Sequence, residues 1–285
     1  MKKIHERLLQ QIAKLASEGK FGEAAHSASQ EYSQIPIGIP TMLKYISDFY
    51  EKNNSTNQEI AKAKDYFCQM LIMLYRETKK LNPSLSTAFI SSFIEDFPDV
   101  DGSLLLPRWN SLAQASLAFK KVATSEDSLL IWQQASRLFQ AYNEFLNGLL
   151  GFLIVAWRCV KDKEINPNVF NSSYAVKARQ FSDLTDGENG VFYLFHRIIK
   201  PKMRNAIAHE TAWLDMDAGK VRYTEGSQQR IEYEMDLIEF LSLTTLGSQV
   251  GSAYIAAIAA VIVLEEGNEK EKSFLPHHLI KLFEH

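Results

Sequence analysis

The spacing of hydrophobic residues predicts helices along most of the chain. At the N-terminus Ile4, Leu8, Leu9, Ile12 and Leu15 fall on one face of a helix over residues 2–17. Glycine and proline residues then separate further segments with helical spacing. We expect helices over residues 23–33, 41–52, 57–81, 84–96, 125–160, 174–184, 191–199 and 235–265, and a short one from about residue 273.

The pattern changes after residue 210. Residues 211–215 and 220–224 flank Met216-Asp217-Ala218-Gly219, which has the composition of a turn, and residues 229–233 also favour a strand. We predict a small hairpin or ribbon here and no other sheet. The expected fold class is therefore all-α, with a small β-hairpin insertion.

The clearest loop divides the chain. Phe97-Pro98-Asp99-Val100-Asp101-Gly102 has strong turn chemistry, and a helix start follows at Ser125-Glu126-Asp127. We expect an N-terminal helical region over residues 1–100, a connecting segment over residues 101–124, and a helical bundle over residues 125–285. The role of the N-terminal region is not indicated by its residues.

Composition is that of an ordinary globular protein. Hydrophobic residues make up 46% and charged residues 23% of the chain, and the formal net charge is −3. A negative net charge provides no overall attraction for nucleic acid, so any RNA binding requires a local basic patch. The amphipathic pattern at the N-terminus leads us to expect no secretion signal there, and Cys68 and Cys159 lie in apolar helical segments, as expected for buried free thiols. We expect a cytoplasmic protein.

One segment has the length of a membrane span. Residues 240–264 carry no charge, and Gly247 and Gly251 form a GxxxG pattern. However, the first half of the segment contains Ser, Thr and Gln residues, and acidic residues flank it at both ends. We favour a buried bundle helix over a membrane span.

The stretch with the most evident chemistry is Arg204-Asn205-Ala206-Ile207-Ala208-His209-Glu210. Arginine is charged at any working pH and binds phosphate with a planar fork of donors. Histidine exchanges a proton near neutral pH. Together they suit cleavage of a phosphodiester without a metal, which makes RNA the first substrate to consider.

This stretch resembles the R-N-x-x-x-H motif of HEPN domains, which are helical bundles found in bacterial toxins and phage-defence nucleases. The resemblance covers roughly residues 125–266, where long apolar helices lie on both sides of the motif. It implies a HEPN-like bundle and a metal-independent endoribonuclease, a toxin or phage-defence effector, that needs no cofactor. It also implies a homodimer in which two motifs meet at a cleft, and an inhibitory antitoxin or defence-system partner.

The expected catalytic residues are Arg204, His209 and Asn205, and Glu210 could support the histidine. Five helical residues turn the chain by roughly 500°, so Arg204 and His209 cannot share one regular helix face. We therefore place His209 at or just past the helix end.

Basic residues precede the motif. We expect Arg197, Lys200 and Lys202 to contact the RNA backbone, with His196 in the same cluster. A second, weaker patch in the hairpin contains Lys220, Arg222 and Arg230. We predict no metal site.

Two other interpretations stay open. The chain could be a non-catalytic HEPN module that binds a nucleotide or a partner protein. It could also be a helical scaffold in which the motif has arisen by chance. An enzyme needs Arg204 and His209 accessible, whereas a scaffold would bury or separate them.

Overall fold

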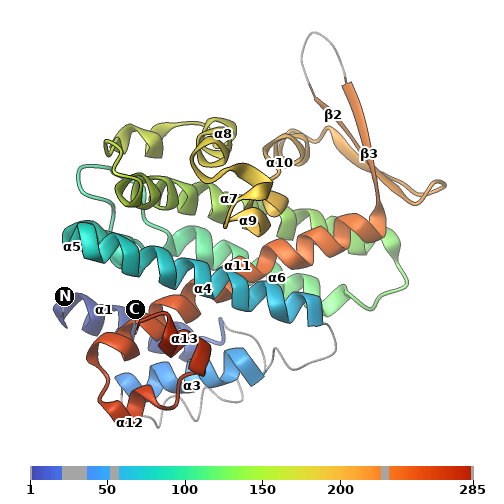
Figure 1. The fold of residues 1–285 in the computed structure, drawn as a ribbon. Helices are drawn as coiled ribbons and strands as arrows, with labels where there is room; N and C mark the ends of the chain where they lie inside the picture. Colours follow the sequence, from blue (N-terminus) through green and yellow to red (C-terminus); the bar gives the residue numbers. More distant parts are fainter. Residues whose placement is uncertain (1, 21–36, 52–57, 226–230, 284–285) are drawn as a thin grey trace.

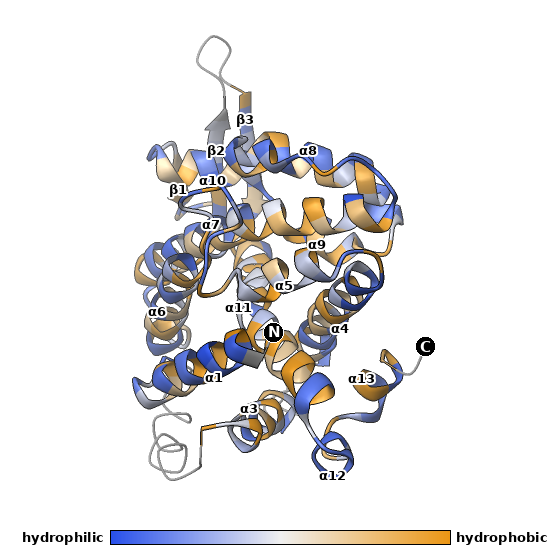
Figure 2. Ribbon diagram, turned by 90° about the vertical axis from the view of Figure 1, so that its left-hand side faces the viewer, coloured by the Kyte–Doolittle hydropathy of each residue, from blue (hydrophilic) through white to orange (hydrophobic). Residues whose placement is uncertain are grey.

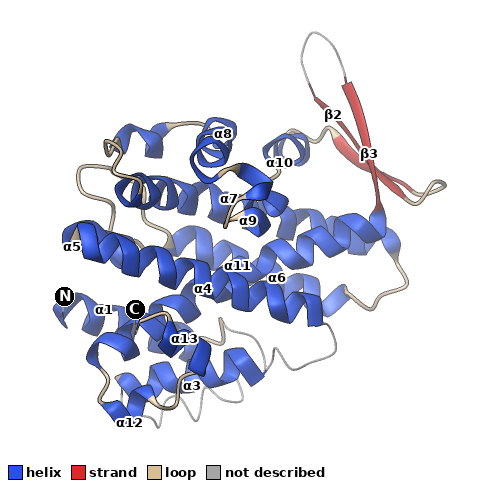
Figure 3. Cartoon of the chain, viewed as in Figure 1, coloured by secondary structure: helices blue, strands red, loops and turns tan. Residues whose placement is uncertain are grey.

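The computed structural model describes residues 2–20, 37–51, 58–225 and 231–283. Helices dominate, with one small sheet at the end of the bundle (Figures 1 and 3). This confirms the expected helical fold with a β insertion. The helix expected over residues 23–33 lies outside the described residues. The helices are α1 (Lys2–Ser17), α3 (Ile39–Glu51), α4 (Gln58–Leu81), α5 (Pro83–Ser91), α6 (Leu106–Val122), α7 (Ser128–Val160), α8 (Tyr174–Thr185), α9 (Tyr193–Ile198), α10 (Pro201–Ala208), α11 (Leu237–Glu266), α12 (Glu269–Lys272) and α13 (His277–Lys281), with 3-10 turns η2 (Pro167–Asn171) and η3 (Gly187–Asn189).

The long helices α7 and α11 form the centre of the bundle. Helix α11 packs against α3, α4 and α7, and α6 runs along α7. Both α7 and α11 are long and apolar enough to cross a membrane, but 78% of the most apolar window in each is buried within this fold. Figure 2 shows that outer helices such as α1 and α4 carry both hydrophilic and hydrophobic residues. The apolar surface of the two long helices is thus used by the bundle core.

The GxxxG pattern of α11 permits close helix packing inside the bundle. A Cβ atom at Gly247 would lie 2.5 Å from the ring of Tyr142 on α7, and one at Gly251 would lie 2.6 Å from Leu112 on α6. The indole nitrogen of Trp109 also donates a hydrogen bond to the Gly251 carbonyl oxygen at 3.0 Å. These glycines therefore bring α6 and α7 against α11, which is a structural role within the protein.

The expected connecting segment over residues 101–124 is not a linker. It contains helix α6, which packs on α7, and the buried core extends without a break from α1, α3 and α4 to α7 and α11. The sequence obscured this because few apolar residues on α6 are buried, chiefly Trp109 and Leu112. The helix expected over residues 84–96 also ends early, at Ser91. Ser92 directly follows the end of α5. Its hydroxyl contacts the Tyr254 hydroxyl at 2.7 Å, and the Ser92 backbone carbonyl accepts a hydrogen bond from the Leu105 amide.

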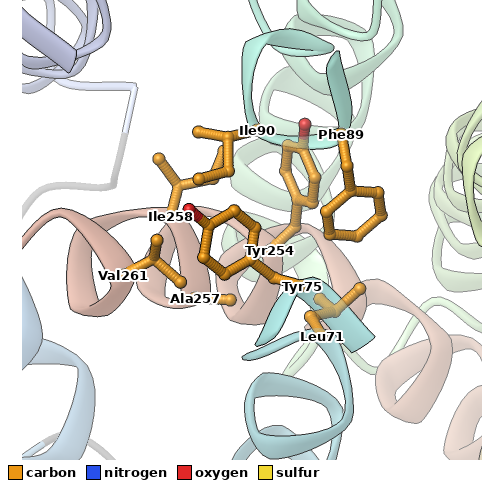
Figure 4. Close-up of a pocket in the computed structure, with 8 residues that line it drawn as sticks. All are labelled: Leu71, Tyr75, Phe89, Ile90, Tyr254, Ala257, Ile258 and Val261. Carbon is orange, nitrogen blue, oxygen red and sulfur yellow. The ribbon is translucent and has the colours of Figure 1, made fainter. Parts of the chain in front are cut away.

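Aromatic and aliphatic side chains fill the junction of α4, α5 and α11. Figure 4 shows Tyr75 and Tyr254 among aliphatic neighbours from the three helices. They leave a space of about 10 Å³, which is no larger than one water molecule requires. Burial raises the pKa of Tyr254 well above its ordinary value. This junction is packed core and is too small for a ligand.

The C-terminal helices fold back onto the N-terminal ones. The His278 ring on α13 contacts the Asp65 carboxylate on α4 at 2.8 Å and the Tyr50 hydroxyl on α3 at 3.4 Å. In addition, His5 of α1 pairs with Glu266 at the end of α11. These polar contacts attach α1 and α13 to the central bundle.

The sheet is an antiparallel meander in the order β1 (Ala212–Asp215), β2 (Lys220–Glu225) and β3 (Ile231–Asp236). It projects from the bundle where α10 ends and α11 begins (Figure 1). Its inner face carries the buried Val221, with Tyr223 stacked on Tyr233 of β3 at 5.1 Å between ring centroids. The predicted hairpin around Met216–Gly219 is confirmed, and the segment at residues 229–233 that was expected to favour a strand contributes the start of β3.

Candidate functional site

Helix α10 carries Lys202, Arg204 and Asn205, with His209 at its C-terminal end, and lies between α7 and the sheet (Figure 1). Pro201 occupies its first turn, where a missing amide hydrogen costs nothing. The proline therefore starts a new helix and does not kink α9, which has already ended at Ile198. Met203 and Ala206 are buried and attach α10 to the core, so Arg204 stands at the edge of the buried face.

Arg204 is held by two oxygen acceptors. Its Nη2 pairs with the Glu144 carboxylate of α7, and its Nη1 donates to the Asn205 side-chain oxygen at 2.8 Å. The side chains of Arg204 and Glu144 are 24% and 32% exposed. The Arg204 Nε is buried and has no hydrogen-bond partner in the described part of the chain. Burial lowers the pKa of the guanidinium, and the Glu144 carboxylate offsets the cost of its desolvation.

A buried asparagine fixes the start of α10 on α7. The Asn143 side-chain oxygen accepts from the Tyr174 hydroxyl at 2.7 Å and from the Lys200 amide at 3.3 Å. Its Nδ2 donates to the Phe139 carbonyl oxygen at 3.0 Å. Asn143 thus joins α7, α8 and the residue before Pro201, which sets the position of Arg204 relative to Glu144.

His209 caps the end of α10, as predicted. The Glu210 amide donates to the Ile207 carbonyl and the Thr211 amide to the Ala206 carbonyl, which is the Schellman pattern of a helix end. His209 is exposed, and its imidazole makes no hydrogen bond or ion pair within the described residues. The ring is therefore accessible to a ligand but is not in contact with Arg204.

Glu210 differs from its expected supporting role. It is exposed and makes no hydrogen bond to the His209 ring within the part of the chain that the structure describes. Instead its backbone adopts the left-handed conformation, with φ of 56°. Glycine is the usual residue at this position of a helix end, because a Cβ atom is strained there. Glu210 thus re-aims the chain after His209 and does not set its tautomer.

The three expected RNA contacts lie at the other end of α10 and on α9. Arg197 is exposed on α9, Lys200 is half-buried at the N-cap of α10, and Lys202 is exposed in the first turn. The Lys202 ammonium lies 5.5 Å from the centre of the Tyr233 ring. Lys200 and Lys202 thus lie at the opposite end of α10 from His209, and Lys202 is turned toward the sheet.

Another member of the expected basic cluster, His196, serves the fold. The His196 ring stacks on Phe181 and its Nε2 contacts the Thr185 hydroxyl at 2.7 Å. Burial lowers its pKa, with Glu188 acting in the opposite direction. The ring of His196 thus packs against α8, which is a structural role.

In the hairpin patch the charges are already neutralised. Arg222 contacts Asp215 at 3.0 Å and Glu232 at 3.0 Å, and Lys220 pairs with Glu234. Arg230 lies outside the described residues. The outer face of the sheet is thus a network of opposite charges with little affinity left for phosphate.

The sequence pattern did not reveal the roles of Asn143 and Glu144. Both lie in the middle of an apolar helix, where single polar residues at adjacent positions are easily taken for a solvent-facing side. The available signal was the pair itself, since Tyr142 and Phe145 on either side are fully buried. A polar pair between core residues needs partners, which Tyr174 of α8, the Lys200 amide and Arg204 of α10 supply.

No known protein aids the interpretation. Comparison with protein-family models, with curated proteins and with solved structures gives no match. In the described segments, no group of three or more His, Cys, Asp and Glu residues is arranged to hold a metal ion. The function must therefore be inferred from the site itself.

Proposed function

We propose that the chain is a metal-independent endoribonuclease of the HEPN type, acting in the cytoplasm as a toxin or phage-defence effector. The observation that carries this proposal is the arrangement at α10. A guanidinium is positioned by Glu144 and Asn205, and an exposed imidazole stands at the end of the same short helix. The R-N-x-x-x-H motif supports the family assignment.

In this reaction the ribose 2′-hydroxyl attacks the adjacent phosphorus and the 5′-oxygen leaves, which yields a 2′,3′-cyclic phosphate. Arg204 would neutralise the negative charge that develops on the phosphoryl oxygens in the pentavalent transition state. Asn205 would hold the guanidinium in place through their hydrogen bond. Glu144 is a positioning residue, because it contacts Arg204 and not the substrate.

His209 would transfer the proton, taking it from the 2′-hydroxyl or giving it to the leaving oxygen. Because its ring does not contact Arg204 within one chain, the HEPN arrangement of a homodimer suits this site. Two copies of α10 would meet so that both imidazoles and both guanidinium groups line one cleft. Arg197, Lys200 and Lys202 would bind the RNA backbone beside it.

One observation favours a second candidate, the non-catalytic HEPN module that binds a nucleotide or a partner protein. Arg204 already has a carboxylate partner in Glu144, so its charge is partly compensated before any phosphate arrives. In such a module the guanidinium would contact a ligand without chemistry following.

Expression in a bacterial host tests the proposal. Wild-type protein should arrest growth if it cleaves cellular RNA, whereas His209→Ala should relieve the arrest at an equal protein level. His277→Ala is the matched control, since His277 is also exposed but lies on α13. Equal growth arrest by the wild type and His209→Ala would rule out His209 as the catalytic group.

A further inference from the structure

A polar cavity lies away from the proposed ribonuclease site at the end of α10. It has a volume of about 200 Å³ and is lined by residues of α6, α7, α8, η2 and the turn at residues 100–103. Among its lining residues are Arg108, Lys177 and Gly148. Asp101 and Asn171 are exposed, so the cavity opens to solvent between them. Nothing in the proposed ribonuclease uses this space.

Two cations line the cavity without a counter-ion. Lys177 of α8 is only 5% exposed, and its ammonium donates to the Asn147 carbonyl oxygen at 3.1 Å. Arg108 of α6 uses Nη1 alone, donating to the Gly102 and Leu104 carbonyl oxygens at 3.2 Å each. Neither side chain forms an ion pair with a carboxylate in the described residues, and the Arg108 Nη2 and Nε are left without partners there. Arg108 is half-buried, whereas a fully buried ammonium such as that of Lys177 is normally paired.

The two charges act on each other. Burial, together with the positive charge of Arg108, lowers the pKa of Lys177 to about 8. Gly148 leaves space for the Arg108 side chain. A Cβ atom at this position would lie 3.0 Å from the Arg108 Cδ and 3.3 Å from its Nη1. A glycine on α7 thus lets the guanidinium reach the cavity. An anion between the two cations would remove their repulsion.

We propose that this cavity binds the terminal phosphate of a small phosphorylated ligand. The planar fork of Arg108 matches phosphate oxygens, and the Lys177 ammonium supplies a second charge-assisted hydrogen bond. Asp101 also lines the cavity, at its exposed side. It therefore disfavours a second negative group near the mouth.

Size and depth decide between a small ligand and an RNA chain. The cavity is larger than the roughly 10–15 Å³ that one water needs but smaller than the roughly 300–1,000 Å³ of pockets that enclose drug-sized ligands. It can hold a phosphate group while the rest of the ligand stays at the mouth. An internal RNA phosphate carries a ribose on both sides and could not reach the buried ammonium of Lys177.

Thermal unfolding and calorimetry in phosphate-free buffer test the proposal, with inorganic phosphate, pyrophosphate and AMP as probes and a 5′-phosphorylated RNA for comparison. At least one probe should raise the Tm of the full chain. Lys177→Gln and Arg108→Gln should each weaken its binding at least tenfold, and Arg108→Lys should recover part of the loss. Arg179→Gln is the matched control, because Arg179 is exposed on the same helix as Lys177 and should bind as the wild type does. Tighter binding of AMP than of inorganic phosphate would identify a nucleotide as the source of the phosphate.

A second readout reports on Lys177 directly. Burial and Arg108 lower the pKa of Lys177 to about 8, so phosphate binding near that pH should favour the charged ammonium and take up protons. Binding enthalpies in buffers of different ionisation enthalpy measure this uptake, which Lys177→Gln should abolish. The groups facing Lys177 are Arg108 from α6 and Asp101 from the turn, while η2 contributes the uncharged Phe170 and Asn171.

Three results would overturn the proposal. The first is that no probe raises the Tm at 10 mM, a concentration roughly a hundredfold above a Kd of about 0.1 mM. The second is equal binding by the wild type and both charge-removing variants. The third is binding of 5′-phosphorylated RNA alone, since that would assign the cavity to RNA ends. None of these results depends on whether the α10 site cleaves RNA.

Discussion

The ion pair between Arg204 and Glu144 can be tested by removing one charge. Glu144→Gln keeps the shape of the side chain but leaves the guanidinium without its carboxylate. Exposed pairs contribute about 0–1 kcal/mol, and breaking a fully buried pair costs about 3–5 kcal/mol. With side chains 24% and 32% exposed, this pair is intermediate and partly screened by solvent. We expect Glu144→Gln to lower the free energy of unfolding by about 1–2 kcal/mol.

Urea unfolding followed by circular dichroism measures this change. With an m-value of about 3 kcal/mol/M, the midpoint should fall by about 0.3–0.7 M at unchanged m. A double-mutant cycle with Arg204→Gln isolates the interaction between the two groups, and we expect a coupling energy of about 1 kcal/mol. Glu126→Gln serves as the control, since Glu126 precedes α7 and is exposed. A coupling energy within about 0.3 kcal/mol of zero would refute the view that Glu144 holds Arg204.

Three further predictions concern the fold. Gly247→Ala should lower stability by about 1–3 kcal/mol in urea unfolding, because its Cβ would lie 2.5 Å from the Tyr142 ring; an unchanged midpoint would contradict this packing. Glu210→Gly should raise the free energy of unfolding by about 0.5–1 kcal/mol, and with it the Tm, because glycine adopts a φ of 56° without strain. A lower Tm would argue against that conformation. Burial lowers the pKa of Lys177 in the folded protein from 10.5 to about 8. Between these two pH values the unfolded chain binds more protons than the folded one, so the stability of the wild type should rise with pH. Lys177→Met should lack that rise, as measured by urea midpoints at pH 7.5 to 10; parallel profiles would show that Lys177 is not the group.

The helices were largely predictable because their apolar residues repeat with helical spacing. Pro201 and the turn at Met216–Gly219 were also readable, since proline and glycine restrict the backbone locally. Helix α6 was missed as a packing element because its buried surface is small and the turn at residues 97–102 precedes it. Local pattern could not show that α6 lies against Gly148 and Gly251, because that contact joins distant parts of the chain.

The site was predictable only in part. The sequence placed His209 at a helix end, because five helical residues separate it from Arg204 by too large an angle. It did not reveal Glu144, 60 residues earlier, as the partner of Arg204. The stacking of His196 on Phe181 was also hidden, since it depends on how α8 and α9 pack together. Long-range polar contacts of this kind follow from the tertiary fold and have no local signature.

The measurement that tests the proposed function most directly is cleavage of a 5′-labelled single-stranded RNA in EDTA. We predict that wild-type protein cleaves it and leaves 2′,3′-cyclic phosphate ends, while Arg204→Ala and His209→Ala, each shown by circular dichroism to be folded at the assay temperature, are at least 100-fold slower. An RNA with a 2′-deoxy residue at the cleaved position should resist cleavage there. Equal cleavage by the wild type and both variants, or ends without the cyclic phosphate, would contradict the proposal that Arg204 and His209 form a ribonuclease site.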